Sequence, residues 1–126
     1  MLHAEREDTA KSALGAVGAG SCGDPGVERA PEAMRIGLDI GSTTTKVVVI
    51  DAQTGEVRYW RYRRHGARQA ESAADALAAV AERFPQARAR IAVTGSGARD
   101  IARALGASYV QEVVANAIAV RALYPG

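Results

Sequence analysis

The chain has 126 residues, of which 24% are charged, and a formal net charge of +2 at neutral pH. This length allows one domain, and the composition is that of an ordinary soluble globular protein with few aromatic residues. The single cysteine, Cys22, excludes an intrachain disulfide, and no apolar run approaches the roughly 20 residues of a membrane span, so we expect a cytoplasmic protein without membrane contact.

Residues 1–34 have the composition of a disordered tail. They show no sustained apolar period and are rich in Gly, Ala and Pro. They lack a basic start followed by an apolar core, so we expect no signal peptide. Because Met34 directly precedes the first expected strand, we hypothesise that translation starts there or that the tail is a dispensable leader. A native N-terminal peptide that begins upstream of Met34 would exclude the first version.

Charge changes at the same boundary. The tail holds three basic and six acidic residues, whereas residues 35–126 hold thirteen and eight. We therefore treat 35–126 as the folded domain. Its net charge of +5 suits an anionic ligand, although it does not identify one.

Residues 35–51 predict a β-hairpin. Apolar side chains at 36, 38 and 40 alternate with Gly37, Asp39 and Gly41, so the strand buries one face and Asp39 lies outward between two glycines. Hydroxyl residues fill the loop at 42–45. Lys46 then leads into a β-branched run, 47–50, that is typical of a buried strand.

This hairpin suits the binding of a polyphosphate with its magnesium ion. Glycine lets the backbone approach an oxyanion, loop N–H and hydroxyl groups donate to it, and Asp39 can hold the metal directly or through water. Lys46 adds a positive charge. A Walker A loop is excluded, because that loop opens a helix and the segment after this one is strand-forming. The alternative is a plain hairpin with a solvated Asp39.

A turn at 52–55 separates the hairpin from residues 56–64, which predict a third antiparallel strand. Arginines that prevent edge-to-edge pairing and aromatic side chains that cover sheet surface favour an edge strand. A surface for a protein partner is the second interpretation. We expect no nucleic-acid partner, although such platforms combine the same residue types. His65 follows in a polar loop and is expected to be exposed. The arginines are Arg58, Arg61, Arg63 and Arg64, and the aromatic residues are Tyr59, Trp60 and Tyr62.

The remaining segments alternate between helix and strand. Residues 68–84 predict the clearest helix, with an apolar stripe and a stop at Pro85. Residues 90–94 predict a short buried strand, 98–105 a helix capped by Gly106, 107–110 a last strand and 111–123 a final helix. The stripe consists of Ala73, Leu77, Val80 and Phe84.

Two of these segments carry candidate site residues. Gly95 and Gly97 lie between a strand and a helix, where a glycine loop can bind an oxyanion or can simply form a tight turn. Glu112 begins the last helix, where the dipole favours a carboxylate whatever its function.

Three stretches resemble one family. Ile36-Gly37-Leu38-Asp39-Ile40-Gly41-Ser42-Thr43-Thr44-Thr45-Lys46 resembles the first phosphate motif of the ATPase superfamily of sugar kinases, heat-shock chaperones and actin. Within this superfamily, the sequence of the motif is most similar to that of the activators of 2-hydroxyacyl-CoA dehydratases and the related benzoyl-CoA reductase subunits. Their Thr-Gly-x-Gly loop resembles 94–97, and their glutamate-bearing helix start resembles 111–117.

The order of elements, βββαβαβα, agrees with this resemblance. It predicts an α/β ribonuclease H-like half of the actin-like ATPase fold, a mixed sheet with helices on its faces. The resemblance implies that Asp39 binds magnesium, that Gly41, Ser42, Thr43 and Thr44 cradle the phosphates of ATP or ADP, and that Lys46 ends the motif. It also implies that Asp39 and Glu112 are the catalytic residues, with Glu112 across the groove from Asp39, where it orients metal-bound water. It covers residues 35–126 and leaves the tail unexplained.

The resemblance further implies ATP-driven electron transfer to a CoA-thioester dehydratase or reductase, and a homodimer with an iron–sulfur cluster. The chain ends before the second half of such a domain, and no cysteine matches the cluster ligands. We therefore expect weak nucleotide binding and negligible turnover from this portion alone. The alternatives are half of a carbohydrate or metabolite kinase, or a non-catalytic module that docks a partner through residues 58–68.

Overall fold

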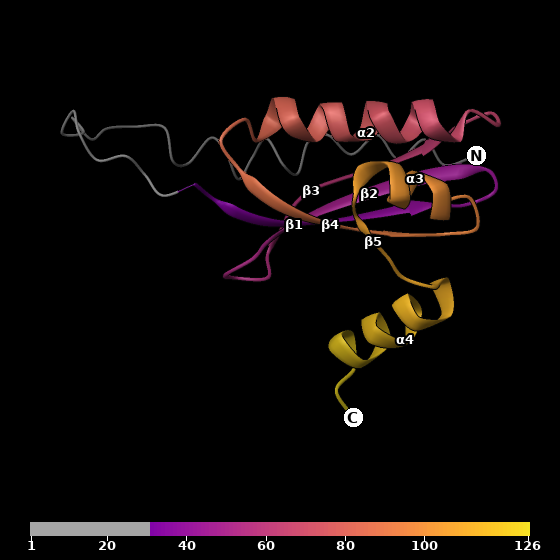
Figure 1. Cartoon of the computed structure of the whole chain (residues 1–126). Helices are drawn as coiled ribbons and strands as arrows, with labels where there is room; N and C mark the ends of the chain where they lie inside the picture. The colour runs from indigo at the N-terminus through magenta and orange to yellow at the C-terminus, as the bar shows by residue number, and fades with distance from the viewer. Residues whose placement is uncertain (1–30) are drawn as a thin grey trace, which may run out of the picture. The chain divides into compact units, whose positions relative to one another are not determined.

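Strands β1 (Ala33–Ile40) and β2 (Thr44–Asp51) form the predicted hairpin at the centre of a five-stranded sheet (Figure 1). The computed structural model describes residues 31–126, so the predictions for the tail up to residue 30, including Cys22, lie outside the described residues. Strand β1 begins two residues earlier than predicted. Met34 lies inside this strand with its side chain buried in the core, instead of directly before it.

The sheet order is β3-β2-β1-β4-β5, with β3 spanning Val57–Arg64, β4 Arg88–Thr94 and β5 Ser108–Tyr109. The first three strands pair antiparallel, whereas β4 and β5 run parallel to β1. Helix α2 (Gln69–Arg83) connects β3 to β4, α3 (Arg99–Leu105) connects β4 to β5, and α4 (Glu112–Leu123) follows. This is the ribonuclease H-like topology, so the predicted fold class and the edge position of β3 are confirmed.

One face of the sheet carries the core. Alternate side chains of β1, β2 and β4 point to the face that α2 and α3 cover. The predicted stripe of α2 packs there, with Ala73 and Val80 buried and Leu77 and Phe84 partly buried. Helix α3 ends at Gly106, whose left-handed conformation confirms the predicted cap. The largest fully buried side chains are Leu38, Ile40, Val47, Val49 and Val93.

The prediction that 47–50 and 90–94 are buried strands was half wrong. Val48, Ile50, Arg90 and Ala92 point to the opposite face, where they are partly or largely exposed. The reason is that α2 and α3 lie on the same face, and no described helix packs on the other. Within residues 31–126, the helices that pack on the sheet therefore cover one of its faces.

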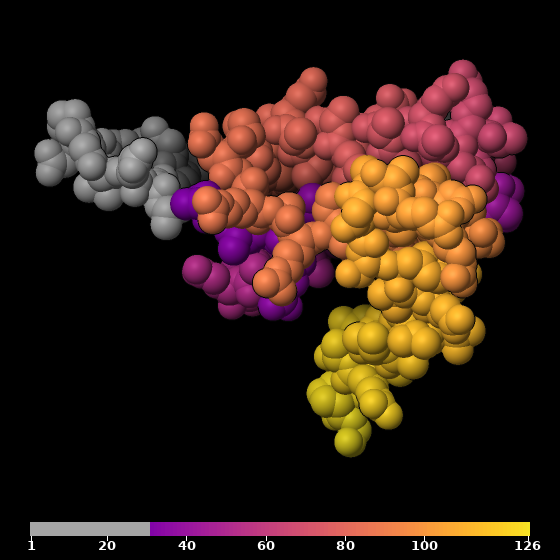
Figure 2. All heavy atoms as spheres, viewed as in Figure 1, coloured from indigo at the N-terminus to yellow at the C-terminus, as the bar shows by residue number. Residues whose placement is uncertain are grey.

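Helix α4 has no buried residue. Four of its large apolar side chains, those of Val113, Ile118, Val120 and Leu123, are more than half exposed. Figure 2 shows this helix, in yellow, with little cover from other elements on the visible face. None of the described helices is long and apolar enough to cross a membrane.

The turn after β2 is organised by the carboxylate of Asp51. Its Oδ1 accepts the N–H groups of Gln53 and Thr54 at 2.8 and 2.9 Å, and its Oδ2 lies 3.4 Å from Arg58 Nη1. These backbone donors, with Arg58, hold the pKa of Asp51 below its ordinary value.

We therefore expect the ionised Asp51 to stabilise the fold above the pKa that this side chain has in the unfolded chain, and to lose that effect as pH falls through the lower folded-state pKa. Urea unfolding of the wild type and Asp51→Asn at several pH values between about 5 and about 2 checks this. The unfolding free energy of the variant should fall less steeply with acid. Parallel pH profiles would contradict this role of the Asp51 charge.

Candidate functional site

The hairpin register brings Asp39 and Lys46 together. They are direct partners across β1 and β2, and Lys46 Nζ donates to Asp39 Oδ2 at 3.0 Å. Both side chains point to the uncovered face of the sheet, beside the loop 41–43, and both remain partly exposed to solvent. The prediction that Asp39 faces outward is confirmed by this geometry.

The electrostatics of this pair favour a charged lysine. The hydrogen bond to Asp39 raises the pKa of Lys46 above its ordinary value, against a smaller opposing effect of burial. The negative charge of Glu112 adds a minor contribution in the same direction. Glu112, at the start of α4, is thus close enough to Lys46 to interact with its charge. The described residues contain no group of three His, Cys, Asp or Glu side chains that could hold a metal.

The second glycine loop packs directly against the end of β1. Gly97 N–H donates to the Ile40 carbonyl at 3.0 Å, and Thr94 is the parallel-strand partner of Asp39. A Cβ on Gly95 would collide with the Ile40 carbonyl and would stand 2.8 Å from Asp39 Oδ1. Glycine is therefore required here for close approach as well as for its positive φ of +108°. The structure brings both predicted loops together around Asp39.

Sequence reasoning missed two residues of this cluster, His65 and Gln69. The prediction of an exposed His65 was wrong, because its side chain is only 5% exposed. The β3–α2 connection turns back under the loop, and His65 N–H donates to the Thr43 carbonyl at 3.1 Å. The Gly66 that follows is a turn signal, but no pattern in the sequence indicated which segment the turn would contact.

The side chains of His65 and Gln69 meet at the same acceptor. His65 Nε2 lies 2.9 Å and Gln69 Nε2 3.3 Å from the Gly41 carbonyl oxygen. The Gln69 amide also occupies the space in which a Cβ on Gly97 would lie. Both glycine loops therefore contact the start of α2.

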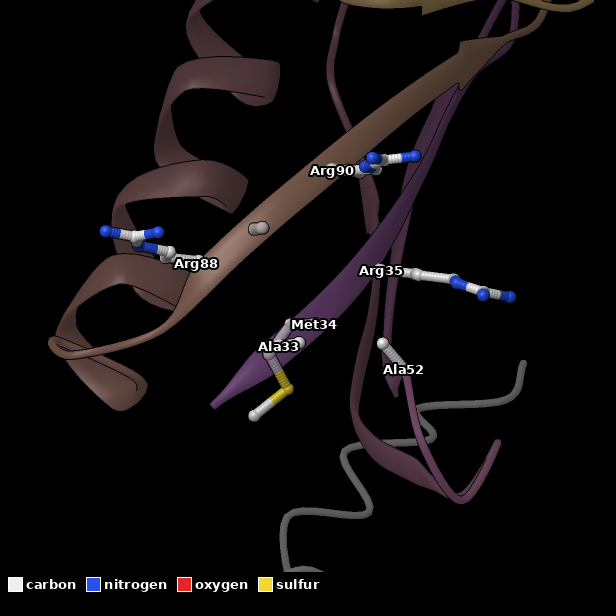
Figure 3. Close-up of a pocket in the computed structure, with 7 residues that line it drawn as sticks. Ala33, Met34, Arg35, Ala52, Arg88 and Arg90 are labelled. Carbon is white, nitrogen blue, oxygen red and sulfur yellow. The ribbon is translucent and has the colours of Figure 1, made fainter. Parts of the chain in front are cut away.

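Two shallow hollows lie elsewhere on β1 and β4, away from the loops. The larger, about 300 Å³, is lined by residues of the opposite end of these strands, including Arg35, Arg88 and Arg90 (Figure 3). Neither hollow contains Asp39 or the loop residues. The candidate site, which loops form, therefore coincides with neither of these hollows.

No protein-family model and no curated protein matches the chain. Among solved structures, the Ppx/GppA family member of Aquifex aeolicus is similar at 14% identity and a TM-score of 0.41, over 65% of this chain and 36% of that one. The type II variant of the Aquifex aeolicus Ppx/GppA phosphatase is similar at 15% identity and a TM-score of 0.40, over 64% and 36%.

The chain therefore spans about a third of the length of these structures. At these identities and TM-scores the likeness assigns neither a fold nor a function to this chain. Neither a family match nor these structures assign the chain to the acyl-CoA dehydratase activators.

The contact between the two loops gives a test of the site's construction. Gly95→Ala should lower the unfolding free energy by about 2–4 kcal/mol, because a strained φ costs about 1–3 kcal/mol and the added Cβ meets backbone. Gly37→Ala is the matched control, since its Cβ would meet nothing within 4 Å. Urea unfolding measures both, and equal effects of the two substitutions would contradict the close packing.

Proposed function

We propose that residues 31–126 form part of a nucleotide-binding actin-like ATPase domain, with the loop Gly41–Thr44 on the phosphates of ATP or ADP. The observation that carries this proposal is the convergence of Asp39, Lys46 and both glycine loops at the carboxyl end of β1. A carboxylate, an ammonium group and loop N–H groups are the groups that polyphosphate binding requires.

The donor set beside the loop fits magnesium. Asp39 supplies carboxylate oxygen, and the hydroxyl of its strand partner Thr94 is buried without a hydrogen-bond partner among the described residues. Magnesium prefers oxygen ligands and keeps several waters, so Asp39 would hold it directly or through water. When bound, the ion supplies charge neutralisation for the phosphates. Lys46, half exposed and flexible, pairs with Asp39 here and can reach a phosphate on the loop instead.

In its finer form the proposal is an ATP-dependent activator of a CoA-thioester dehydratase or reductase. Its support is the resemblance of three stretches, 36–46, 94–97 and 111–117, to the sequence motifs of these activators. Glu112 would then act across the groove from Asp39. The iron–sulfur cluster of such activators does not fit this chain, because residues 31–126 contain no cysteine. The partner acyl-CoA enzyme and the homodimer are further parts of this proposal.

A docking module is the second candidate, and one observation favours it. Trp60 and Tyr62 of the edge strand are 44% and 55% exposed. Such aromatic side chains are enriched at protein interfaces. Loss of partner capture in a variant with both Arg61 and Arg63 changed to Glu would support docking, and unchanged capture would count against it. Half of a metabolite kinase remains the alternative within the same superfamily.

Calorimetric titration of the full chain with ADP and magnesium tests the main proposal. We expect weak binding by the wild type. Asp39→Asn and Lys46→Met should each weaken it about tenfold, which corresponds to about 1.4 kcal/mol.

Asp75→Asn is the matched control, since Asp75 is an exposed carboxylate on α2 outside the site. It should bind as the wild type does. Equal affinity of wild type and Asp39→Asn would contradict the proposed role of Asp39. Absence of binding by the wild type would refute nucleotide binding by this portion of the domain.

A further inference from the structure

The hairpin turn at 41–44 has only one of the two backbone hydrogen bonds expected between its first and fourth residues. Gly41 N–H donates to the Thr44 carbonyl at 2.9 Å, as in a two-residue hairpin turn. In such a turn the carbonyl of the first residue ordinarily accepts the N–H of the fourth. Here the Gly41 carbonyl accepts instead from the side chains of His65 and Gln69. The β3–α2 segment therefore decides where this carbonyl points.

The direction of that carbonyl sets the direction of the next amide. A trans peptide is planar, so the Gly41 C=O and the Ser42 N–H point to opposite sides of the chain. Holding the carbonyl toward His65 and Gln69 turns the Ser42 N–H away from them. Ser42 and Thr43 are exposed, and within residues 31–126 their N–H groups donate to no backbone acceptor. The Ser42 N–H is thus an unpaired donor on the side of the chain opposite His65 and Gln69.

His65 is held rigidly in this role. Because a carbonyl oxygen only accepts, His65 Nε2 carries the proton of this hydrogen bond. Its Nδ1 is buried without a hydrogen-bond partner among the described residues, so Nε2 makes the ring's one hydrogen bond there. The backbone N–H of His65 is fixed by Thr43 as well. His65 therefore contacts the loop at two points, through its ring at Gly41 and through its backbone at Thr43.

Gln69 connects this arrangement to the second loop. Its amide lies between the Gly41 carbonyl, to which it donates, and Gly97. Gly97 in turn donates to Ile40, the last residue of β1. One side chain at the start of α2 thereby sets the spacing of both loops.

We propose that His65 and Gln69 are positioning residues that orient the Gly41–Ser42 peptide and so present the Ser42 N–H group to a phosphate. The role toward phosphate rests on the proposed function, whereas the orientation of the peptide does not. Both residues act from the side of the loop opposite to the presented donor.

Three variants of the full chain separate the effect of losing a side-chain N–H donor from the effect of changing side-chain volume. His65→Leu removes the ring donor, and His65→Gln restores a side-chain N–H donor. Gln69→Glu keeps the shape and replaces the amide by oxygens that only accept. Gln53→Glu, in the exposed turn after β2, makes the same charge change away from the loop and serves as the control.

Two measurements are made on each variant. The carbonyl ¹³C resonance of Gly41 in the nucleotide-free chain reports the hydrogen bonds that this carbonyl accepts. Calorimetry with ADP and magnesium reports phosphate binding. Thermal unfolding identifies any variant that has lost its fold. If His65→Leu has lost its fold, the comparison of Gln69→Glu with His65→Gln decides the question.

We expect His65→Leu and Gln69→Glu to shift the Gly41 resonance and to weaken binding about tenfold, as loss of one hydrogen bond does. His65→Gln should stay within about threefold of the wild type, and Gln53→Glu should match it. An unmoved resonance in folded His65→Leu and Gln69→Glu, or a moved resonance with unchanged affinity, would overturn the inference.

The failure of the proposed function has a different signature. A wild type that binds no ADP refutes the phosphate site and with it the role of these residues toward phosphate. The Gly41 resonance still judges the orientation in that case. A shift in the variants supports it, and an unmoved resonance overturns it too.

Discussion

Strand β1 is the element on which the site depends, because it is hydrogen-bonded along both sides. Its antiparallel partner β2 returns through the loop 41–43, and its parallel partner β4 ends beside it. Parallel pairing brings the carboxyl ends of β1 and β4 to one edge of the sheet, where loops can meet around a ligand. The contact of Gly95 with the Ile40 carbonyl follows from this pairing. Any residue with a Cβ at position 95 would force the two strand ends apart.

The Asp39–Lys46 pair contributes to the site more than to stability. Exposed or half-exposed ion pairs are worth about 0–1 kcal/mol, because solvent screens them and two side chains lose freedom. Its value lies in position, since it holds a carboxylate and an ammonium group beside the exposed loop residues Ser42 and Thr43. The same charges would interact more strongly if a ligand or another part of the protein excluded water from this edge.

The stability of the described unit comes from a single core on one sheet face. Valines and isoleucines of the hairpin pack against the small residues of α2, with Ala73 and Ala76 buried at the contact. Small side chains let the helix approach the sheet closely. On the other face, Arg35 and Arg90 are direct cross-strand partners, and neither forms an ion pair within residues 31–126. Like charges directly opposite each other slightly destabilise strand pairing, and this face therefore contributes little to the stability of the sheet.

Sequence alone determined the elements of this protein, their order and the residues of the first loop. Alternation of apolar residues in 36–40, the spacing of four, three and four in α2 and the glycine at 106 are local signals that short-range sterics and solvation enforce. The motif around Asp39 was readable for the same reason, since its glycines and hydroxyls are contiguous.

Only the tertiary structure decided what lies behind that loop. His65 and Gln69 are 24 and 28 residues from Gly41, and their contact with its carbonyl depends on how the β3–α2 connection turns. The exposure of α4 and of one sheet face likewise depends on which elements are present to cover them. Alternation in 36–40 showed which face of β1 is packed, but the unbroken apolar run 47–50 carried no sign that one of its faces stays uncovered. These features arise from long-range contacts, for which a single sequence carries no local signal.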